Sequence, residues 1–369
     1  MLAQRQVIDR AIDADVARSR RAGLLVDLLG ALLWAALLAS VLRSARTPDA
    51  AAPMRDLLLL VAAIYVLSRL VSSLHRWVVP AVIAVLATTI AVWQLGGMIS
   101  VVRVDPLGYA NASAALYLTG CAAALVVAAR ARQREARNAA VCGAVVCAAV
   151  PWADTAFASA LLALPLPIAL VSRQLGVRVR KVIAASATAA VLVLGATAVI
   201  GATWRSGSSL DAVVTQTLSG NRAQLWSDAL ELISSSPLQG VGTNRFSVES
   251  PTASGDVDLR WAHNEYLQLG AEVGMPGLIL AVAVALWVFL RLAVGGRDQG
   301  TAVAAVGLAG ASIAASVDYV WHFAPVLVAA AALAGSAGGV VRRPRWRGGI
   351  VRDGKSLVDA AVAGDALSP

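Results

Sequence analysis

The chain has 369 residues, and its composition excludes an ordinary soluble protein. Hydrophobic residues make up 58% of it and the mean hydropathy is +0.71, whereas soluble domains are about half apolar. The net charge of +9 does not indicate a nucleic-acid-binding protein, because the basic residues flank apolar runs and no nucleic-acid fold signature occurs. We therefore predict an all-α, polytopic membrane helix bundle.

Ten apolar runs approach the roughly 20 residues that a helix needs to cross a bilayer. They span approximately 24–42, 57–74, 78–95, 112–129, 138–151, 156–172, 182–203, 274–292, 301–317 and 319–341. The run at 138–151 is short, so a helical hairpin that dips partway into the membrane is an alternative for residues 138–172. The sequence predicts about ten transmembrane helices.

Lys and Arg gather beside alternate ends of these runs, as expected for cytoplasmic loops. The pattern predicts that both termini are cytoplasmic and that the one long polar interval lies outside. The predicted organisation is a cytoplasmic N-terminal segment at 1–23, a seven-helix membrane bundle at 24–203, a large external loop at 204–273, three C-terminal membrane helices at 274–341 and a basic cytoplasmic tail at 342–369.

Metal and disulfide chemistry find no support in the sequence. The three cysteines, Cys121, Cys142 and Cys147, lie inside apolar runs, where a thiol behaves as a small hydrophobe. The pair Asp256 and Asp258 lacks supporting ligands, so we interpret both as solvated loop acids. We expect no metal and no cofactor.

The external loop is predicted to contain two helices with a polar segment between them. Leu and Ala recur at three-to-four-residue spacing from about Asn221 to Ser234, which predicts an amphipathic helix whose apolar face meets the membrane–water boundary. A second helix, about 262–273, would present His263 and Tyr266 on one side. The polar residues 250–258 are interpreted as a mobile lid.

Motifs follow in a fixed order through this loop. Arg222 precedes Leu-Trp, the turn at 237–242 reads Pro-x-x-Gly-x-Gly, and His263 begins His-Asn-x-x-Leu. A Glu-x-Gly-x-Pro-Gly segment at 272–277 follows, and Asp318-Tyr319 with a later proline comes after one more span. Over roughly residues 219–335 this order resembles the O-antigen ligase and O-antigen polymerase family of membrane glycosyltransferases.

The resemblance implies transfer of a glycan from an undecaprenyl-diphosphate-linked donor to an acceptor hydroxyl, at the outer face of the cytoplasmic membrane and without a metal. Guanidinium groups suit a diphosphate, and an imidazole suits removal of the hydroxyl proton. Direct attack would invert the anomeric configuration. The implied catalytic residues are His263 and Arg222, and the implied substrate-binding residues are Arg205, Arg245, Arg260, Asn264 and Tyr266.

Several alternatives stay open. The acceptor is a glycolipid, a glycan or a protein, and the motifs do not separate a ligase from a polymerase or a protein O-oligosaccharyltransferase. The short chain favours the ligase type over the longer polymerases. A transporter of lipid-linked sugars and a non-catalytic polysaccharide-assembly protein are alternatives of another class. A second family arginine is missing from residues 151–159, so either Arg103, Arg205 or Arg245 replaces it, or donor binding differs, or activity is lost. Asp318, Tyr319 and His322 are assigned to packing at the outer interface.

Overall fold

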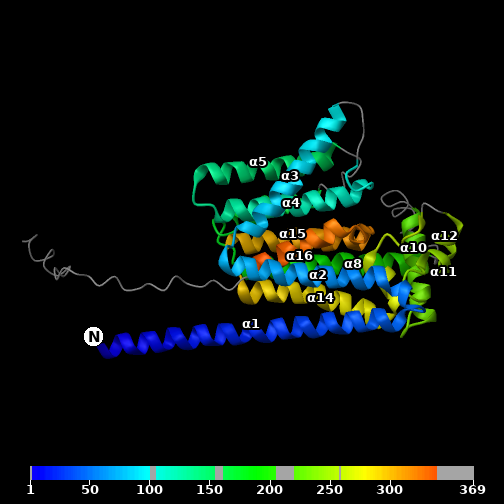
Figure 1. The fold of residues 1–369 in the computed structure, drawn as a ribbon, viewed down its shortest axis with the longest axis horizontal. Helices are drawn as coiled ribbons and strands as arrows, with labels where there is room; N and C mark the ends of the chain where they lie inside the picture. The colour runs from blue at the N-terminus through cyan, green and yellow to red at the C-terminus, as the bar shows by residue number, and fades with distance from the viewer. Residues whose placement is uncertain (1, 100–104, 154–160, 205–219, 257–258, 339–369) are drawn as a thin grey trace, which may run out of the picture.

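The computed structural model describes residues 2–99, 105–153, 161–204, 220–256 and 259–338. These residues form helices packed side by side, without any strand in the described ranges (Figure 1). The prediction of an all-α, polytopic helix bundle is confirmed. The predicted tail at 342–369 lies outside the described residues.

Eight helices are long and apolar enough to cross a membrane. They are α1 (Leu2–Ser44), α2 (Pro48–Leu74), α3 (Val78–Ile99), α4 (Ala110–Arg130), α5 (Arg134–Ala153), α8 (Val179–Thr203), α14 (Met275–Gly295) and α15 (Gln299–Val317). Each corresponds to one predicted apolar run. The basic residues before the first run continue that helix, because α1 starts at Leu2.

The two remaining predicted runs form shorter helices. The described part of the sixth run contains α7 (Pro165–Val171), which is seven residues long. The last run is divided, because Asp318 ends α15 and the turn η3 (Val320–His322) precedes α16 (Ala324–Ala337). Pro325 stands in the first turn of α16, where a missing N–H costs nothing.

Two of the eight long helices lie in the interior of the bundle. In the apolar windows of α4 and α15, 89% and 83% of the residues are buried, against 17% in both α2 and α8. Both inner helices are rich in small residues, which let helix backbones approach closely within a membrane. At Gly307 an added Cβ would lie 2.4 Å from the Cβ of Ala122, so this crossing needs glycine. The outer helices turn their leucines outward, as lipid contact requires.

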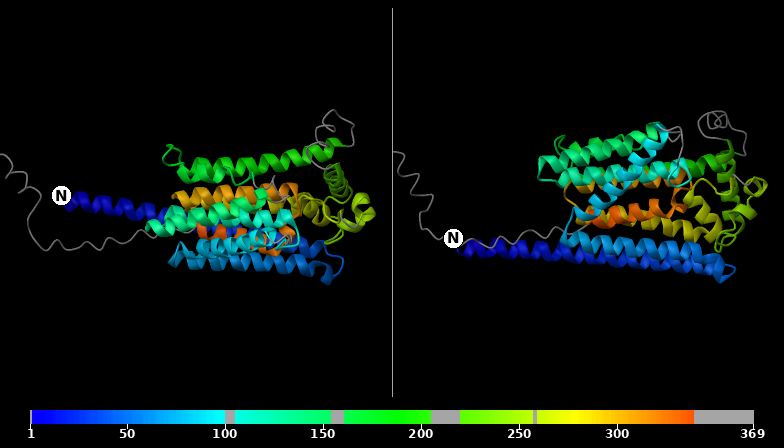
Figure 2. Two further views of the ribbon diagram at one scale, coloured as in Figure 1. Left: turned by 90° about the horizontal axis from the view of Figure 1, so that it is seen from above. Right: turned by 45° about the horizontal axis from the view of Figure 1, so that its top comes forward.

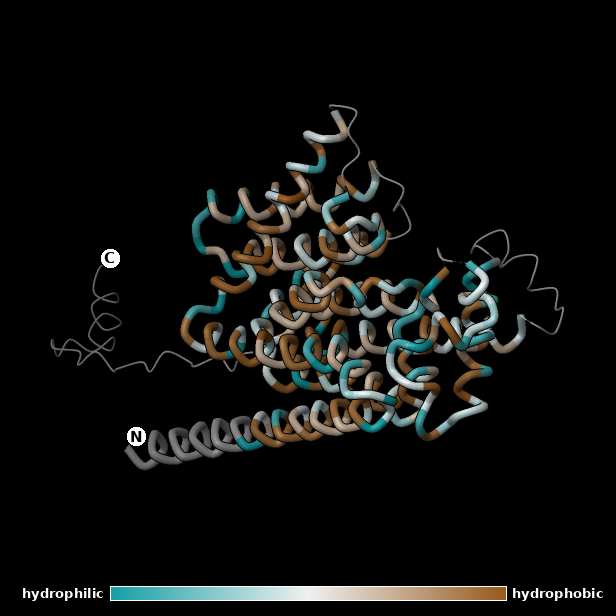
Figure 3. The backbone as a smooth tube through the Cα atoms, turned by 45° about the vertical axis from the view of Figure 1, so that its right-hand side comes forward, coloured by the Kyte–Doolittle hydropathy of each residue, from teal (hydrophilic) through white to brown (hydrophobic). Residues whose placement is uncertain are grey.

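The two ends of the bundle, which Figure 2 shows from two further sides, differ in their polar residues (Figure 3). At the end nearer the N-terminus, Asp27 of α1 is 2.7 Å from Arg69 of α2 and 2.7 Å from Arg291 of α14. Arg130, where α4 ends, pairs with Asp298 before α15 at the same end. The opposite end carries a polar cap of short helices, and the site described below lies there.

The polar cap consists of α10 (Gly220–Ser235), α11 (Phe246–Glu249), α12 (Pro251–Gly255) and α13 (Glu265–Val273). The predicted amphipathic helix at 221–234 is confirmed as α10. Its apolar face does not meet lipid, however, since Leu225, Trp226 and Ala229 are fully buried against α8 and α13. The apolar stripe therefore predicted the helix correctly. The expectation that this stripe faces the membrane–water boundary was wrong, because it packs against other helices of the protein.

The described residues 250–256 of the predicted lid include the short helix α12, and their mobility stays a prediction. Ser250 caps α12, accepting a hydrogen bond from the backbone N–H of Ala253 at 3.1 Å. The Asp228 carboxylate of α10 accepts from the Ser250 hydroxyl at 2.7 Å and from the Thr252 N–H at 3.0 Å. These bonds hold the segment against α10.

The Pro-x-x-Gly-x-Gly turn joins the cap to the junction of α13 and α14. The N–H groups of Val241 and Gly242 donate to the carbonyls of Ala271 and Glu272 at 2.9 and 3.0 Å. Gly240 has a φ of +68°, and an added Cβ would lie 2.3 Å from the Glu272 carbonyl oxygen. The glycines thus permit a close backbone approach that a larger residue would prevent.

Candidate active site

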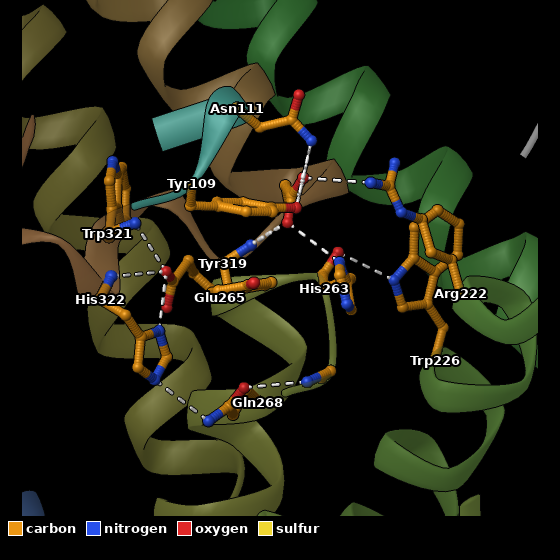
Figure 4. Close-up of polar contacts among 12 residues, drawn as sticks. Tyr109, Asn111, Arg222, Trp226, His263, Glu265, Gln268, Tyr319, Trp321 and His322 are labelled. Atoms are coloured by element: carbon orange, nitrogen blue, oxygen red, sulfur yellow. Dashed lines mark hydrogen bonds and ion pairs between the residues drawn. The ribbon is translucent and has the colours of Figure 1, made fainter. Parts of the chain in front are cut away.

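A buried carboxylate, Asp318, lies at the centre of the polar residues beneath the cap. Its Oδ1 is 3.0 Å from His263 Nδ1, and its Oδ2 is 3.1 Å from Arg222 Nη2. His263 comes from the segment before α13 and Arg222 from α10, so three distant parts of the chain meet at one side chain (Figure 4). The contacts join the two residues predicted to be catalytic.

Three further groups donate hydrogen bonds to the same carboxylate. The Tyr109 hydroxyl lies 2.7 Å and the Asn111 amide nitrogen 2.5 Å from Oδ2, and the Tyr319 N–H lies 2.8 Å from Oδ1. Burial alone would raise the pKa of Asp318, but the hydrogen bond to His263 and the charge of Arg222 outweigh it and lower this pKa. Asp318 is therefore held in its charged form.

This lowered pKa predicts how acid affects the fold. Because the pKa of Asp318 is lower in the folded chain than the unfolded value of about 3.9, its contribution to stability is present above about pH 4 and is lost as the pH falls through the folded-state pKa. We expect the difference in thermal midpoint between the wild type and Asp318→Asn to shrink on acidification. A difference that stays constant from neutral pH into this acid range would contradict the expectation.

His263 has an unusual backbone conformation. Its φ is +50°, in the left-handed region that non-glycine residues seldom adopt. The indole N–H of Trp226 donates to its carbonyl at 3.1 Å, and its ring stands edge-on to that of Tyr319, with 4.7 Å between centroids. The prediction that His263 shares one helix face with Tyr266 is wrong, because α13 begins only at Glu265.

The contact with Asp318 determines what the imidazole can do. An Nδ1–H that donates to a carboxylate leaves Nε2 as the unprotonated nitrogen, which is the tautomer a general base needs. No hydrogen-bond partner of Nε2 occurs within the described ranges. The side chain is 12% exposed, so the imidazole is largely buried but part of it can still be reached by a substrate. This geometry suits removal of a proton from a hydroxyl.

Asn264 serves as the N-cap of α13. Its side-chain oxygen accepts from the N–H groups of Tyr266 and Leu267 at 3.1 and 3.0 Å, and its amide nitrogen donates to the Thr197 hydroxyl of α8 at 2.9 Å. Both ends of the amide are used, and the residue is fully buried. These contacts give Asn264 a role in positioning His263, and they lend no support to substrate binding.

Tyr266 points into the helix bundle. Its side chain is 3% exposed and stands edge-on to Trp321, with 5.2 Å between ring centroids. It lines a small apolar cavity between α8, α14 and α15, together with Phe289 and Ser312. These surroundings favour a packing role, and substrate binding by Tyr266 stays a prediction.

The predicted arginines occupy different surroundings. Arg222 is 24% exposed and contacts Asp318 through Nη2, and no described contact involves its Nε or Nη1. Arg245 instead donates to Glu249 at 3.0 and 2.6 Å, in a cluster that includes Arg46. Arg260 is exposed. Arg205 and Arg103 lie outside the described residues, as do residues 154–160 of the segment that lacks the family arginine.

A metal site finds no support within the described part of the chain. No group of three or more His, Cys, Asp or Glu residues gathers there in a way that could hold an ion. Asp258, one of the two loop acids considered from the sequence, lies outside the described residues.

The sequence interpretation missed three members of this site. Asp318 was assigned to packing, although an acidic residue at the end of an apolar run is a recognisable signal for function. Tyr109 and Asn111 lie 209 and 207 positions before Asp318, and no local pattern connects them to it. Their contribution becomes visible only when α4 and α15 pack together.

The comparison with protein families agrees with the motifs. Residues 152–282 match the family model described as O-antigen ligase, a segment that contains Arg222 and His263 and covers less than half of the chain. No curated protein matches the chain. Asp318 lies beyond the matched segment. The resemblance carried by the motifs is confirmed for this segment, which is similar to O-antigen ligase, and the chain as a whole is a multi-pass helical membrane protein.

Proposed function

We propose that the chain is a membrane glycosyltransferase that moves a glycan from an undecaprenyl-diphosphate-linked donor to an acceptor hydroxyl. The observation that carries this proposal is the convergence of His263 and Arg222 on Asp318, at the end of an apolar bundle. A base and a cation are the two groups that such a transfer needs, one at the acceptor and one at the leaving group.

The charge distribution supports a location of the site on the outer side of the cytoplasmic membrane. Basic residues occupy the turns at the end of the bundle opposite to the polar cap. They are Arg76, Arg130, Arg132, Arg134, Arg173, Arg178, Arg180, Lys181 and Arg297. Because Lys and Arg accumulate in cytoplasmic loops, these turns and both termini are assigned to the inside.

The donor diphosphate is assigned to Arg222. A planar guanidinium binds phosphate oxygens bidentately and stabilises the charge that develops as the leaving group departs. Its Nε and Nη1 have no partner in the described ranges, while Asp318 holds Nη2 in place. This donor clamp relies on the side chain's own charge, so no metal is part of the proposal.

The acceptor hydroxyl is assigned to His263. Its Nε2 takes the hydroxyl proton as the oxygen attacks the anomeric carbon, and the bond from that carbon to the diphosphate breaks in the same step. The proton remains on the imidazolium, which Asp318 stabilises at 3.0 Å, and the lipid diphosphate leaves with the bonding electrons. A single displacement of this kind inverts the anomeric configuration.

The test is glycan transfer by purified protein from a lipid-linked donor, with the product anomer determined by NMR. We expect an inverted product and a rate about 10²–10³ lower in Arg222→Ala, the usual loss when one charge-stabilising donor is removed. Arg46→Ala is the matched control, because Arg46 is 59% exposed and pairs with Glu249. A retained anomer would exclude the single displacement, and wild-type transfer by Arg222→Ala would exclude the clamp.

A transporter is the competing function from another class. Transporters of charged substrates place ionisable groups near the membrane midplane in broken helices. Here the ion pairs of the described bundle lie near its ends, Asp27 with Arg69 and Arg291 at one and Asp318 with Arg222 at the other. This distribution favours an enzyme whose chemistry takes place at one surface of the membrane.

A further inference from the structure

Aromatic rings gather beside His263, and Figure 4 shows Tyr109 and Tyr319 on the side of its ring away from Arg222. Tyr319 contacts the His263 ring, and Trp261 lies 6.4 Å from Tyr319 and 4.1 Å from His322, measured between ring centroids. We call Trp261 and Tyr319 the aromatic platform. Both are half-buried, although they stand beside the most polar cluster of the cap.

The platform differs from the tryptophans that serve only packing. Trp226 and Trp287 are 0% and 4% exposed, and each indole N–H donates to a backbone carbonyl. Trp261 keeps part of its surface open, and its indole N–H has no partner within the described ranges. The Tyr319 ring is stacked on Tyr109, with 4.6 Å between centroids, so the exposed part of Trp261 is the apolar surface that this cluster offers to a ligand.

A carboxylate lies at the edge of the platform. Glu265 Oε1 accepts from the N–H of Trp321 at 2.7 Å and from the N–H and Nδ1 of His322, both at 3.0 Å. The second oxygen, Oε2, has no partner among the described residues, and the side chain is 11% exposed. Burial lowers the pKa of His322, but the charge of Glu265 and its hydrogen bond to the ring more than offset this and raise the pKa, which favours the charged form of the ring that lies tilted against Trp261.

We propose that the aromatic platform and Glu265 form the acceptor subsite, and that they bind a sugar ring there. This inference rests on the proposed function, because it assigns the acceptor to the side of His263 opposite the donor clamp. The C–H groups on one face of a pyranose carry partial positive charge and are attracted to the negative face of an aromatic ring, while its hydroxyls reach a carboxylate.

The consequence is a choice between acceptor classes. A serine or threonine side chain has no ring to stack, so a protein acceptor would leave the platform unused. A glycan or glycolipid acceptor uses both the face of Trp261 and the free oxygen of Glu265. The acceptor of this chain is therefore a sugar hydroxyl.

Binding tests this assignment without requiring transfer. Saturation-transfer NMR on the full chain in detergent would compare manno-, gluco- and galacto-oligosaccharides with a Ser/Thr-rich peptide. We expect sugar binding by the wild type, binding about tenfold weaker in Trp261→Ala and an intermediate value in Trp261→Phe. Trp77→Ala is the matched control, because Trp77 is 57% exposed in the turn between α2 and α3, at the opposite end. Equal sugar binding by the wild type and Trp261→Ala, peptide binding in place of sugar, or no sugar binding by the wild type would overturn the subsite.

Transfer kinetics separate this inference from the proposed function. With a sugar acceptor, Trp261→Ala is expected to raise the acceptor KM about tenfold, whereas Trp77→Ala is expected to leave it at the wild-type value. An unchanged acceptor KM, with transfer intact, would overturn the subsite alone. A wild-type protein that neither transfers nor hydrolyses the donor would overturn the glycosyltransferase assignment, while the NMR result would still decide whether the platform binds sugars.

Discussion

Replacing His263 with alanine is expected to lower the rate of glycan transfer by a factor of about 10²–10⁴, the usual contribution of a positioned general base. The imidazole is the group whose Nδ1 is fixed by Asp318 and whose Nε2 is left to accept a proton. Without it, the acceptor hydroxyl must lose its proton to water. Transfer from a purified lipid-linked donor, at saturating donor and acceptor, measures the effect.

The loss must be separated from unfolding. His263 has a φ of +50°, a conformation that is strained for alanine as well as for histidine. The thermal midpoint of the variant therefore has to be measured alongside its transfer rate. His75→Ala is the matched control, because His75 ends α2 at the opposite end of the bundle. Wild-type transfer by a folded His263→Ala protein would remove histidine from the mechanism.

Asp318→Asn is expected to cause a loss of similar size, about 10²–10⁴ in the transfer rate. Asparagine keeps the shape but replaces one acceptor oxygen with an N–H group, which then faces a donor from either His263 or Arg222. An imidazole that must accept at Nδ1 carries its proton on Nε2 and no longer serves as a base. The charge that holds Arg222 near the donor is lost at the same time.

A second ion-paired aspartate provides the comparison for this variant. Asp298 pairs with Arg130 and caps α15 through the N–H of Thr301, at the end of the bundle away from His263. Asp298→Asn is expected to lower the thermal midpoint without changing the transfer rate per folded molecule. If Asp298→Asn slowed transfer as much as Asp318→Asn, the effect of Asp318 would have to be attributed to stability.

Much of the fold follows from apolar run length. A run near 20 residues has to be helical in lipid, because every backbone polar group must find its partner within the segment. That reasoning located the eight long helices, and the three-to-four-residue spacing located α10. It did not determine what each face contacts, which depends on neighbours far away in the chain: Trp226 packs against α8 and α13, and lipid was expected instead.

Local capping signals would have corrected two errors. Asn264 followed by Glu265 is a common start of a helix, with a side chain that accepts backbone N–H groups and an acid in the first turn. Ser250 followed by Pro251 carries the same kind of signal for α12. From hydrophobic spacing alone, α13 was predicted to begin too early, at about residue 262, and the residues of α12 were interpreted as a polar loop.

The candidate site could be predicted only in part. His263 and Arg222 were found because short motifs surround them, but the carboxylate that joins them is separated from His263 by 55 positions and from Arg222 by 96. Tyr109 and Asn111 are farther still. Such contacts arise from the packing of α4, α10 and α15, so a single sequence holds no periodicity that would reveal them.

The central claim is that Asp318 acts through His263 and Arg222 without touching the substrate. The most direct measurement is therefore donor affinity together with the single-turnover transfer rate, both determined on Asp318→Asn. For Asp318→Asn we predict a donor Kd close to that of the wild type and a single-turnover transfer rate that is lower by a factor of about 10²–10⁴. A single-turnover rate equal to that of the wild type would contradict this account.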